Sequence, residues 1–337
     1  MLKLQSDIAS SKEVVPVILC GGVGKRVWPL SSDKMPKQFL KIESEHSSLQ
    51  ETIKRFTSNC FKKPIIMTAL QYETFVEQDL LELEVDYEII FLEENQRNTA
   101  MPSILAALYI ELIYGDALML IAPSDHYISP NFAMNSVIEQ AISFTEDSIV
   151  IFGIKPNSPS TEYGYIRVGN IIKHDIAYEV KSFKEKPDIE SAISYIQSGE
   201  YFWNSGYFLV KASKYLSVIY DLEPEILRYC KEVFADKVKN KIYNLRAINT
   251  EYVKSSINRL QRMNVAYENI ECLGTASNKS IDEILSKSRC ELMTMVELKE
   301  IEWADLGSWK SRFEVSKKDA KNNFIAGKSL YQRLCKL

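Results

Sequence analysis

The first two-thirds of the chain alternate between short apolar runs, typical of buried strands, and longer segments with helical periodicity. The strand-like runs are Val14–Cys20, Ile65–Ala69, Glu88–Leu92, Leu118–Ala122 and Ser148–Gly153. The helical patterns between them cover Leu49–Phe56, Tyr72–Glu82, Thr99–Tyr114 and Asn135–Phe144. Such alternation joins parallel neighbours through crossover helices. It predicts an α/β fold with a doubly wound, mostly parallel sheet that has helices on both faces.

The pattern changes in the later part of the chain. Further strand-like runs are Tyr163–Val168, Tyr178–Lys184, Gly206–Val210 and Glu291–Leu298. Helical patterns cover Ile189–Ser198 and most of residues 211–262, Tyr252–Met263 included. Neither a repeat nor a low-complexity linker divides the chain. We therefore expect an N-terminal extension over residues 1–13, one α/β domain over residues 14–310 and a short tail over residues 311–337.

Composition and charge exclude several classes of function. The formal net charge of -4 argues against nucleic acid or an anionic membrane as the main partner. The N-terminus lacks the apolar core of a signal peptide, and no run approaches the ~20 apolar residues of a membrane span. These features predict a cytoplasmic protein whose partners are small molecules.

A glycine-rich segment follows the first apolar run and carries the strongest functional signal. Its glycines are Gly21, Gly22 and Gly24. Glycines let the backbone approach a ligand and turn its N–H groups toward it, which is how many proteins hold phosphates. Arg26 comes two residues later and Lys37 eleven residues after that, so cations stand where a triphosphate needs them. The segment therefore predicts a phosphate-binding loop.

Two better-known glycine motifs do not fit this spacing. The dinucleotide fingerprint needs G-x-G-x-x-G, and the Walker A loop needs G-x-x-x-x-G-K-[ST]. A glycine-rich turn with solvated cations remains the plain alternative for G-G-x-G-x-R alone. The continuation into W-P-L-S and P-K-Q-F-L favours the phosphate-binding interpretation.

Two aspartates end strand-like runs at the edge where a doubly wound sheet binds ligands. Asp125 follows Leu118–Ala122, and Asp305 ends a later run just before Leu306. Mg²⁺ takes one or two carboxylates together with phosphate oxygens. Each aspartate alone would equally suit the cap of a turn or helix. Because the glycine segment lies at the same edge, the pair is a candidate Mg²⁺ site.

Polar residues farther along are candidates for binding a nucleobase and a sugar. The segment Glu94–Ala100 follows a strand-like run and leads into a helix. Its candidate base-binding residues are Gln96, Asn98 and Thr99. Asn98 or Thr99 would also cap the helix, so capping and base binding both stay open.

Three short motifs place polar groups where a sugar phosphate could bind. Gly164, between two tyrosines, allows close approach of a sugar ring or marks a bulge. Glu185 can accept hydrogen bonds from sugar hydroxyls and Lys186 can hold a phosphate, although the pair would also suit an exposed turn. Asn204 adds an amide group suited to reading hydroxyl stereochemistry.

Together these segments resemble the signature of the mannose-1-phosphate guanylyltransferases, a family of sugar-nucleotide pyrophosphorylases. The loop reads G-G-V-G-K-R-V-W-P-L-S and leads to P-K-Q-F-L. The chain continues in the family's order with E-N-Q-R-N-T-A, T-E-Y-G-Y-I, F-K-E-K-P and W-N-S-G, over roughly residues 14–310.

The resemblance implies a Rossmann-like nucleotidyltransferase fold and a Mg²⁺-dependent reaction of GTP with α-D-mannose 1-phosphate. The products would be GDP-mannose and pyrophosphate, with GDP-mannose available for polysaccharide synthesis. Arg26 and Lys37 would be catalytic, and Asp125 and Asp305 would hold the metal. The nucleotide would be bound by Gly21, Gly22, Gly24, Gln96, Asn98 and Thr99. The sugar phosphate would be bound by Gly164, Glu185, Lys186 and Asn204.

The sequence departs from the family's pattern at a few positions. Lys25 replaces a small hydroxyl residue, and Lys287 and Ser288 replace a glutamate and a lysine. Two alternatives therefore stay open: the same transfer with another sugar 1-phosphate or nucleotide, or a weakened homologue acting as a regulatory subunit. A homo-oligomer also stays open. The tail is too short for a full β-helix or an isomerase domain, so isomerase activity is not expected.

Overall fold

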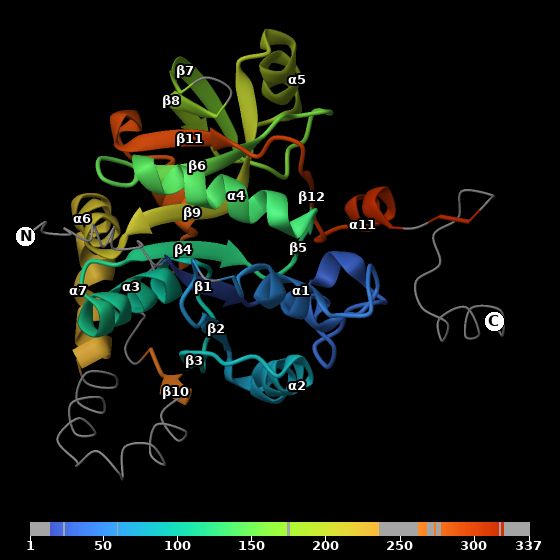
Figure 1. The fold of residues 1–337 in the computed structure, drawn as a ribbon, viewed down its shortest axis with the longest axis vertical. Coiled ribbons are helices and arrows are strands. Elements are labelled where there is room, and N and C mark those ends of the chain that lie inside the picture. The colour runs from blue at the N-terminus through green and yellow to red at the C-terminus, as the bar shows by residue number, and fades with distance from the viewer. Residues whose placement is uncertain are drawn as a thin grey trace, which may run out of the picture.

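The computed structural model describes residues 14–22, 24–58, 60–173, 176–235, 262–267, 273, 278–316 and 318–319, and its centre is a ten-stranded sheet (Figure 1). The strands of this sheet are β1 (Val14–Cys20), β2 (Ile65–Ala69), β3 (Ile89–Glu93), β4 (Leu118–Pro123), β6 (Ile149–Ile154), β7 (Tyr165–Lys173), β8 (Ala177–Lys184), β9 (Tyr201–Lys211), β10 (Arg262–Val265) and β11 (Met293–Glu297). A second, two-stranded sheet pairs β5 (His126–Ser129) with β12 (Glu302–Asp305).

The order β10-β3-β2-β1-β4-β9-β6-β11-β8-β7 divides the large sheet into two halves. All neighbours from β10 to β4 are parallel. Strand β9 runs antiparallel between β4 and β6, and β8 and β7 are antiparallel to their neighbours. The predicted α/β class is therefore confirmed, and the parallel half carries the glycine segment at the end of β1.

Helices cover both faces of the sheet (Figure 1). The α-helices are α1 (Ser48–Arg55), α2 (Glu73–Leu83), α3 (Ala100–Tyr114), α4 (Asn131–Ala141), α5 (Ile189–Ser198), α6 (Ala212–Leu222), α7 (Pro224–Val233), α10 (Ile281–Leu285) and α11 (Trp309–Val315). In the described part of the chain, none of the helices combines the length and the apolarity that crossing a bilayer demands.

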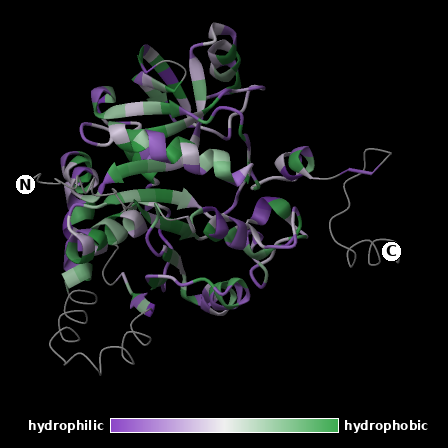
Figure 2. Ribbon diagram, in the orientation of Figure 1, coloured by the Kyte–Doolittle hydropathy of each residue, from purple (hydrophilic) through white to green (hydrophobic). Residues whose placement is uncertain are grey.

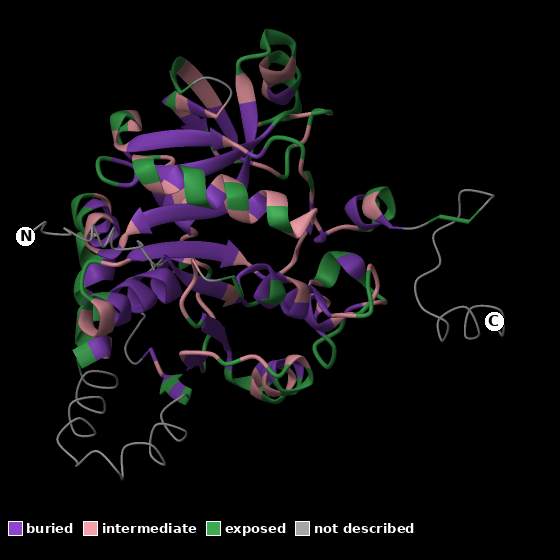
Figure 3. Cartoon of the chain, in the orientation of Figure 1, coloured by how far each residue is buried: buried purple, intermediate pink, exposed green. Residues whose placement is uncertain are grey.

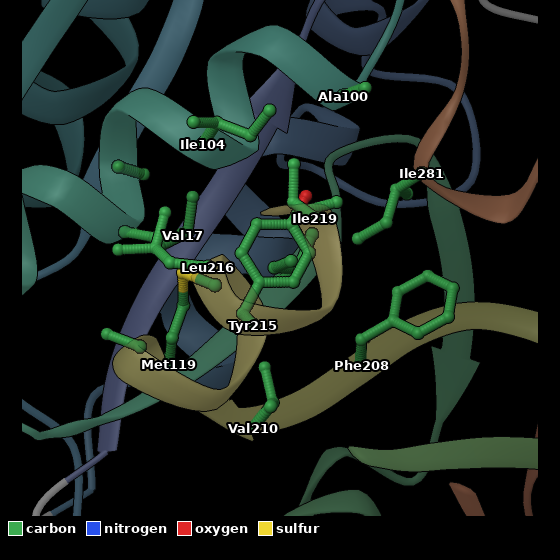
Figure 4. Packing of buried hydrophobic residues seen from close by; sticks show 14 of the residues in the cluster. Val17, Ala100, Ile104, Met119, Phe208, Val210, Tyr215, Leu216, Ile219 and Ile281 are labelled. Atoms are coloured by element: carbon green, nitrogen blue, oxygen red, sulfur yellow. The ribbon is translucent and has the colours of Figure 1, made fainter. Parts of the chain in front are cut away.

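Alternating side chains of β1 supply two separate cores. Val15 and Val17 pack on the face that α3, α6 and α7 cover, whereas Ile18 and Cys20 pack against α1 and α2. Figure 4 shows Val17 among side chains of α3, α6, β4 and β9. The central strands are hydrophobic and buried, while α5 lies at the exposed end (Figures 2 and 3). A strand buried on both faces explains the continuous apolar run in the sequence.

Several boundaries differ from the sequence-based expectation. Residues 252–261 of the predicted helix Tyr252–Met263 lie outside the described residues, but Arg262 and Met263 belong to strand β10, which pairs in parallel with β3. The hydrogen bonds available at the edge of the sheet outweigh the helical pattern there. Helix α4 begins at Asn131 instead of Asn135, directly after Pro130, which is its extended N-cap residue. Helix α11 crosses residue 310, and the domain limits stay predictions.

A buried ion pair joins the last described helix to the loop before α1. Arg312 of α11 pairs with Glu43, and their side chains are only 0% and 9% exposed. Arg312 Nη2 also lies 3.5 Å from the carbonyl oxygen of Lys37. This contact fixes α11 beside the segment that presents Lys37.

Removing one partner of this pair would leave the other charge buried without compensation. We expect Arg312→Met to lower the free energy of unfolding by about 3 kcal/mol, measured by urea denaturation. The matched control is Arg289→Met, because the Arg289–Glu291 pair is exposed and contributes little. Equal losses in the two variants would contradict this account.

Candidate active site

The glycine segment bends sharply where β1 ends. Gly22 and Gly24 have φ angles of +85° and +75°, which side-chain-bearing residues rarely adopt. A Cβ on Gly24 would lie 2.7 Å from the Cβ and Cγ atoms of Lys37, and one on Gly21 would lie 2.6 Å from Gln96 Nε2. The missing side chains therefore let Lys37 and Gln96 lie directly against the loop.

Lys37 connects the loop to both predicted metal ligands. It begins a short 3₁₀ helix, Lys37–Phe39. Its Nζ forms an ion pair with Asp125 Oδ2 and lies 3.9 Å from Asp305 Oδ1. Asp125 follows β4, and Asp305 pairs with His126 in the β5–β12 sheet. The small sheet thus brings together two carboxylates that are 180 positions apart in sequence.

Electrostatics fix the charge states of this cluster. Burial would raise the pKa of the Asp125 carboxyl, but the nearby Lys37 ammonium, His126 and the hydrogen bonds to the carboxylate together hold that pKa well below its usual range. Burial would lower the pKa of Lys37, but Asp125 and Asp305 together raise it. Two carboxylates and one ammonium leave the cluster with a negative charge that a divalent cation can balance.

The donor atoms at this point fit a metal ion. One ligand atom each of Asp125, His126 and Asp305 lie within 4.8 Å of one another. His126 Nδ1 accepts a hydrogen bond from Trp303 Nε1 at 3.3 Å, and burial lowers the pKa of the imidazole, so it stays neutral. Carboxylate oxygens suit a hard cation best. The site is thus an acidic metal-binding candidate centred on the two aspartates.

A cavity of about 400 Å³ opens beside the glycine segment. It brings together most of the predicted nucleotide-binding residues with one metal candidate: Gly21, Gly22, Gln96, Asn98, Thr99 and Asp125. Gln96 Oε1 accepts a hydrogen bond of 3.5 Å from the backbone of Gly22, which places its amide over the loop. Gly24 does not line this cavity and instead packs on Lys37.

The side chains of Asn98 and Thr99 are committed to backbone contacts. Asn98 Nδ2 donates to the carbonyl of Asn278 at 3.2 Å, and Thr99 Oγ1 accepts from the backbone of Ile281 at 2.9 Å. Thr99 stands at the N-cap of α3, but no side-chain capping bond forms there. The expected cap is therefore wrong, because Thr99 instead holds the start of α10 against α3.

The predicted sugar-binding residues also meet, with one additional member. A Cβ on Gly164 would lie 2.6 Å from Glu185 Oε2, and the backbone N–H of Asn204 donates to the Gly164 carbonyl at 2.8 Å. Asn204 Nδ2 donates to Asp282 Oδ1 at 2.6 Å. Burial and the nearby Asp282 raise the pKa of Glu185 to about 7, and Lys186 Nζ lies 3.4 Å from Glu185 Oε1.

Arg26 stands at the outer side of the acidic cluster. A Cβ on Gly307 would lie 2.8 Å from Arg26 Nη2 and 2.9 Å from Asp305 Oδ1, so the guanidinium is beside the carboxylate. Arg26 also forms an ion pair with Glu162, and both side chains are more than half exposed. Because the pair is exposed, it holds the Arg26 guanidinium only weakly.

Comparison with known proteins places the chain in a family. The family model for nucleotidyl transferases matches residues 15–322. The chain belongs to the nucleotidyl transferase family. A mannose-1-phosphate guanylyltransferase of Escherichia coli is 34% identical over 94% of this chain and 64% of its own length. The xanthan biosynthesis protein XanB of Xanthomonas campestris pv. campestris is 34% identical over 92% of this chain and 61% of its own. The chain therefore spans less than two thirds of these relatives.

Solved structures share the fold. A Thermus thermophilus structure described as a mannose-1-phosphate geranyltransferase superimposes with a TM-score of 0.70, at 23% identity, over 91% of this chain and 80% of its own. A Helicobacter pylori structure described as a mannose-6-phosphate isomerase gives a TM-score of 0.68, at 25% identity, over 87% of this chain and 100% of its own. Both likenesses show that this fold occurs in solved structures.

Sequence reasoning missed two carboxylates that line the cavity of this nucleotidyl transferase, the buried Glu93 and the partly buried Asp282. Glu93 ends β3, is 4% exposed and accepts a 2.6 Å hydrogen bond from Tyr267 Oη. Burial raises its pKa to about 7. A glutamate ending an otherwise apolar strand was the available signal.

Lys287, which departs from the family's pattern, pairs with Glu283 at 3.3 Å, and its side chain is about half exposed. This substitution therefore leaves Asp282 undisturbed.

The raised pKa of Glu93 makes stability depend on pH. The folded carboxyl keeps its proton up to about pH 7, whereas the unfolded one loses it near pH 4.5. Unfolding free energy should therefore fall as pH rises through this window, by up to about 3 kcal/mol, because the unfolded state then binds fewer protons. Glu93→Gln removes this loss and keeps an acceptor for Tyr267.

Urea denaturation of both proteins between pH 4 and pH 8 checks this prediction. The variant should gain stability relative to the parent as pH rises, with most of the gain between pH 4.5 and 7. The neighbouring, exposed Glu94→Gln is the control and should follow the parent. A parent–variant difference that stays constant with pH would contradict the raised pKa.

Proposed function

We propose that this nucleotidyl transferase joins GTP to α-D-mannose 1-phosphate and releases pyrophosphate, forming GDP-mannose. The observation that carries the proposal is the contact of Lys37 with Asp125 and Asp305 beside the glycine loop and its cavity. Such a cluster suits the reaction of two phosphorylated molecules. The names of the relatives supply the identity of the sugar and the nucleotide.

The chemistry proposed needs positioning and charge neutralisation more than proton transfer. A phosphate oxygen of the sugar phosphate attacks the α-phosphorus of GTP, and the bond to the β-phosphate oxygen breaks on the opposite side. The attacking oxygen is already an anion, so no general base is required. Arg26 and Lys37 would stabilise the charge that develops on the phosphates, and the backbone N–H groups of the glycine loop would orient the triphosphate.

The proposed cofactor is Mg²⁺, held by Asp125 and Asp305. When bound, it would neutralise phosphate oxygens and supply a Lewis acid. The fit rests on the two carboxylates that meet at Lys37 and on the negative charge left in that cluster. Lys37 would then share the carboxylates with the metal and turn its remaining donors to the triphosphate.

Glu93 supports guanine as the base. Guanine presents two neighbouring donors, N1–H and the N2 amino group, on one edge. Glu93 can accept from both once it has lost the proton that it holds up to about pH 7. Adenine presents an acceptor at N1, and uracil and thymine present a single N–H between two carbonyls. Tyr267 holds one oxygen of Glu93, which lines the cavity beside the glycine loop. A buried acceptor of this kind disfavours bases that leave it unpaired.

The sugar phosphate is proposed to bind at the cluster of Gly164, Glu185 and Asn204, with Lys186 at its rim. The missing side chain of Gly164 lets Glu185 approach closely. Its carboxylate and the Asn204 amide would bind hydroxyl groups. The exposed ammonium of Lys186, which now pairs with Glu185, would turn to the phosphate.

Arg26 should be needed for turnover. Because it would contact the reacting phosphates, we expect Arg26→Ala to lower kcat by at least ~10²-fold, in line with losses of single oxyanion donors. Pyrophosphate release at saturating GTP and mannose 1-phosphate measures this. Lys25→Ala, which removes the adjacent exposed cation, should keep most of the activity. Near-normal turnover of Arg26→Ala would overturn the catalytic assignment.

Base reading by Glu93 can be tested with ITP, which lacks the N2 amino group. Glu93→Gln turns a donor toward that amino group, which disfavours GTP more than ITP. We expect the ratio of kcat/KM for GTP to that for ITP to fall at least ~10-fold in this variant. Glu94→Gln, at an exposed neighbouring position, should leave the ratio unchanged. A ratio unaffected in Glu93→Gln would contradict the assignment.

A further inference from the structure

A second cavity, of about 260 Å³, lies beside helix α1. None of the residues assigned above to nucleotide or sugar binding lines it, and neither do Asp125 and Asp305, although His126 between the two sites does. One face of α1 lines it through Ser48, Glu51 and Arg55, which the helical period places in a row. Strand β5, the loop before α1, Asn131 of α4 and Leu306 form the rest of its wall. We call it the α1 cavity.

Arg55 gives the α1 cavity a buried positive charge. The residue is only 1% exposed. Its Nε donates to Asn131 Oδ1 at 3.0 Å and its Nη1 to Tyr207 Oη at 3.2 Å, so both acceptors are neutral. Within the described residues, no ion pair includes Arg55. A buried guanidinium without a counter-ion is unfavourable, and an anion in the adjoining cavity would relieve this.

The carboxylates around the α1 cavity do not supply that counter-ion. Glu43 is paired with the buried Arg312. Glu51 lies one helical turn from Arg55, but it accepts a 2.7 Å hydrogen bond from Ser44 Oγ and stays partly exposed. Glu51 is thus placed to accept hydrogen bonds from neutral groups of a ligand.

Ser48 provides a second, independent sign of a ligand. It lines the α1 cavity and is 6% exposed, yet its hydroxyl has no hydrogen-bond partner among the described residues. Buried hydroxyls are normally satisfied. Ser48 and Arg55 stand at opposite ends of α1, about 10 Å apart along the axis. A molecule that satisfies both is therefore larger than a bare ion.

We propose that the α1 cavity binds a small hydroxylated oxyanion, either a phosphate monoester or a carboxylate. The oxyanion contacts Arg55, while hydroxyl groups of the ligand meet Glu51 and Ser48. The cavity also includes His126 and Leu306, the residues that follow Asp125 and Asp305, and the Leu306 N–H donates to the Asp125 carbonyl at 3.1 Å. A ligand there contacts the segment that positions Asp125 and Asp305, so its binding could change the geometry of the active site and regulate the enzyme.

The test measures binding of inorganic phosphate and, separately, malonate by isothermal titration calorimetry. Asn131→Asp places a carboxylate on the atom that Arg55 already contacts, without changing its size. We expect this variant to bind the preferred anion at least ~10-fold more weakly, since the cation is already neutralised. Lys54→Gln, which removes an exposed cation next to Arg55, should bind like the parent.

The variant Lys37→Ala shows whether the anion binds in the α1 cavity or at the phosphate-binding loop. Binding retained in Lys37→Ala and lost in Asn131→Asp supports the proposal, and the preference between phosphate and malonate identifies the ligand class. Binding lost in Lys37→Ala and kept in Asn131→Asp would place the anion in the active site and overturn it. No binding of either anion to the parent protein would also overturn it. Glu51→Gln removes a nearby negative charge, so it should tighten binding of malonate, which has no hydroxyl group for Glu51 to accept from.

Discussion

The contact of Lys37 with Asp125 and Asp305 holds the functional end of this molecule together. The two carboxylates are mostly buried, with side chains 18% and 23% exposed, and would repel each other without the ammonium between them. Lys37 reaches them only because Gly24 leaves room for its side chain, and the Arg312–Glu43 pair supports the segment from behind. The glycine loop, the end of β4 and the small β5–β12 sheet are therefore fixed by one cation.

The two halves of the large sheet supply different parts of the site. The parallel half presents the glycine loop and Glu93 at the ends of β1 and β3, as expected for a doubly wound sheet. The mixed half contributes Gly164, Glu185 and Asn204 from the region of β7, β8 and β9. Asp282 joins the halves, since it lines the cavity of the first and accepts a hydrogen bond from the second. Such a division suits a reaction that must bring two phosphorylated substrates together.

Local signals made much of the fold predictable, whereas contacts between distant segments left no such signal in the sequence. Strands β1 and β2 matched their apolar runs, and α5 matched its pattern because Asp188 caps it through Ser191 N. The α/β class and the position of the glycine loop after β1 could be predicted from such strand and helix patterns. Strand β5 has four residues, is partly exposed and exists only through its pairing with β12. The only local sign of Glu93 was its place at the end of an apolar strand, and its contact with Tyr267, 174 positions away, left no local pattern.

The most direct test measures pyrophosphate release with Mg²⁺ for GTP, ATP, UTP and dTTP, each paired with mannose 1-phosphate or glucose 1-phosphate. We expect release with GTP and mannose 1-phosphate and little with any other pair, because Glu93 would accept from both donors of guanine and the Glu185–Asn204 cluster would bind the sugar. Release confined to another pair would contradict the substrate assignment. Nucleotide binding without release in every combination would contradict catalysis itself and favour a regulatory subunit.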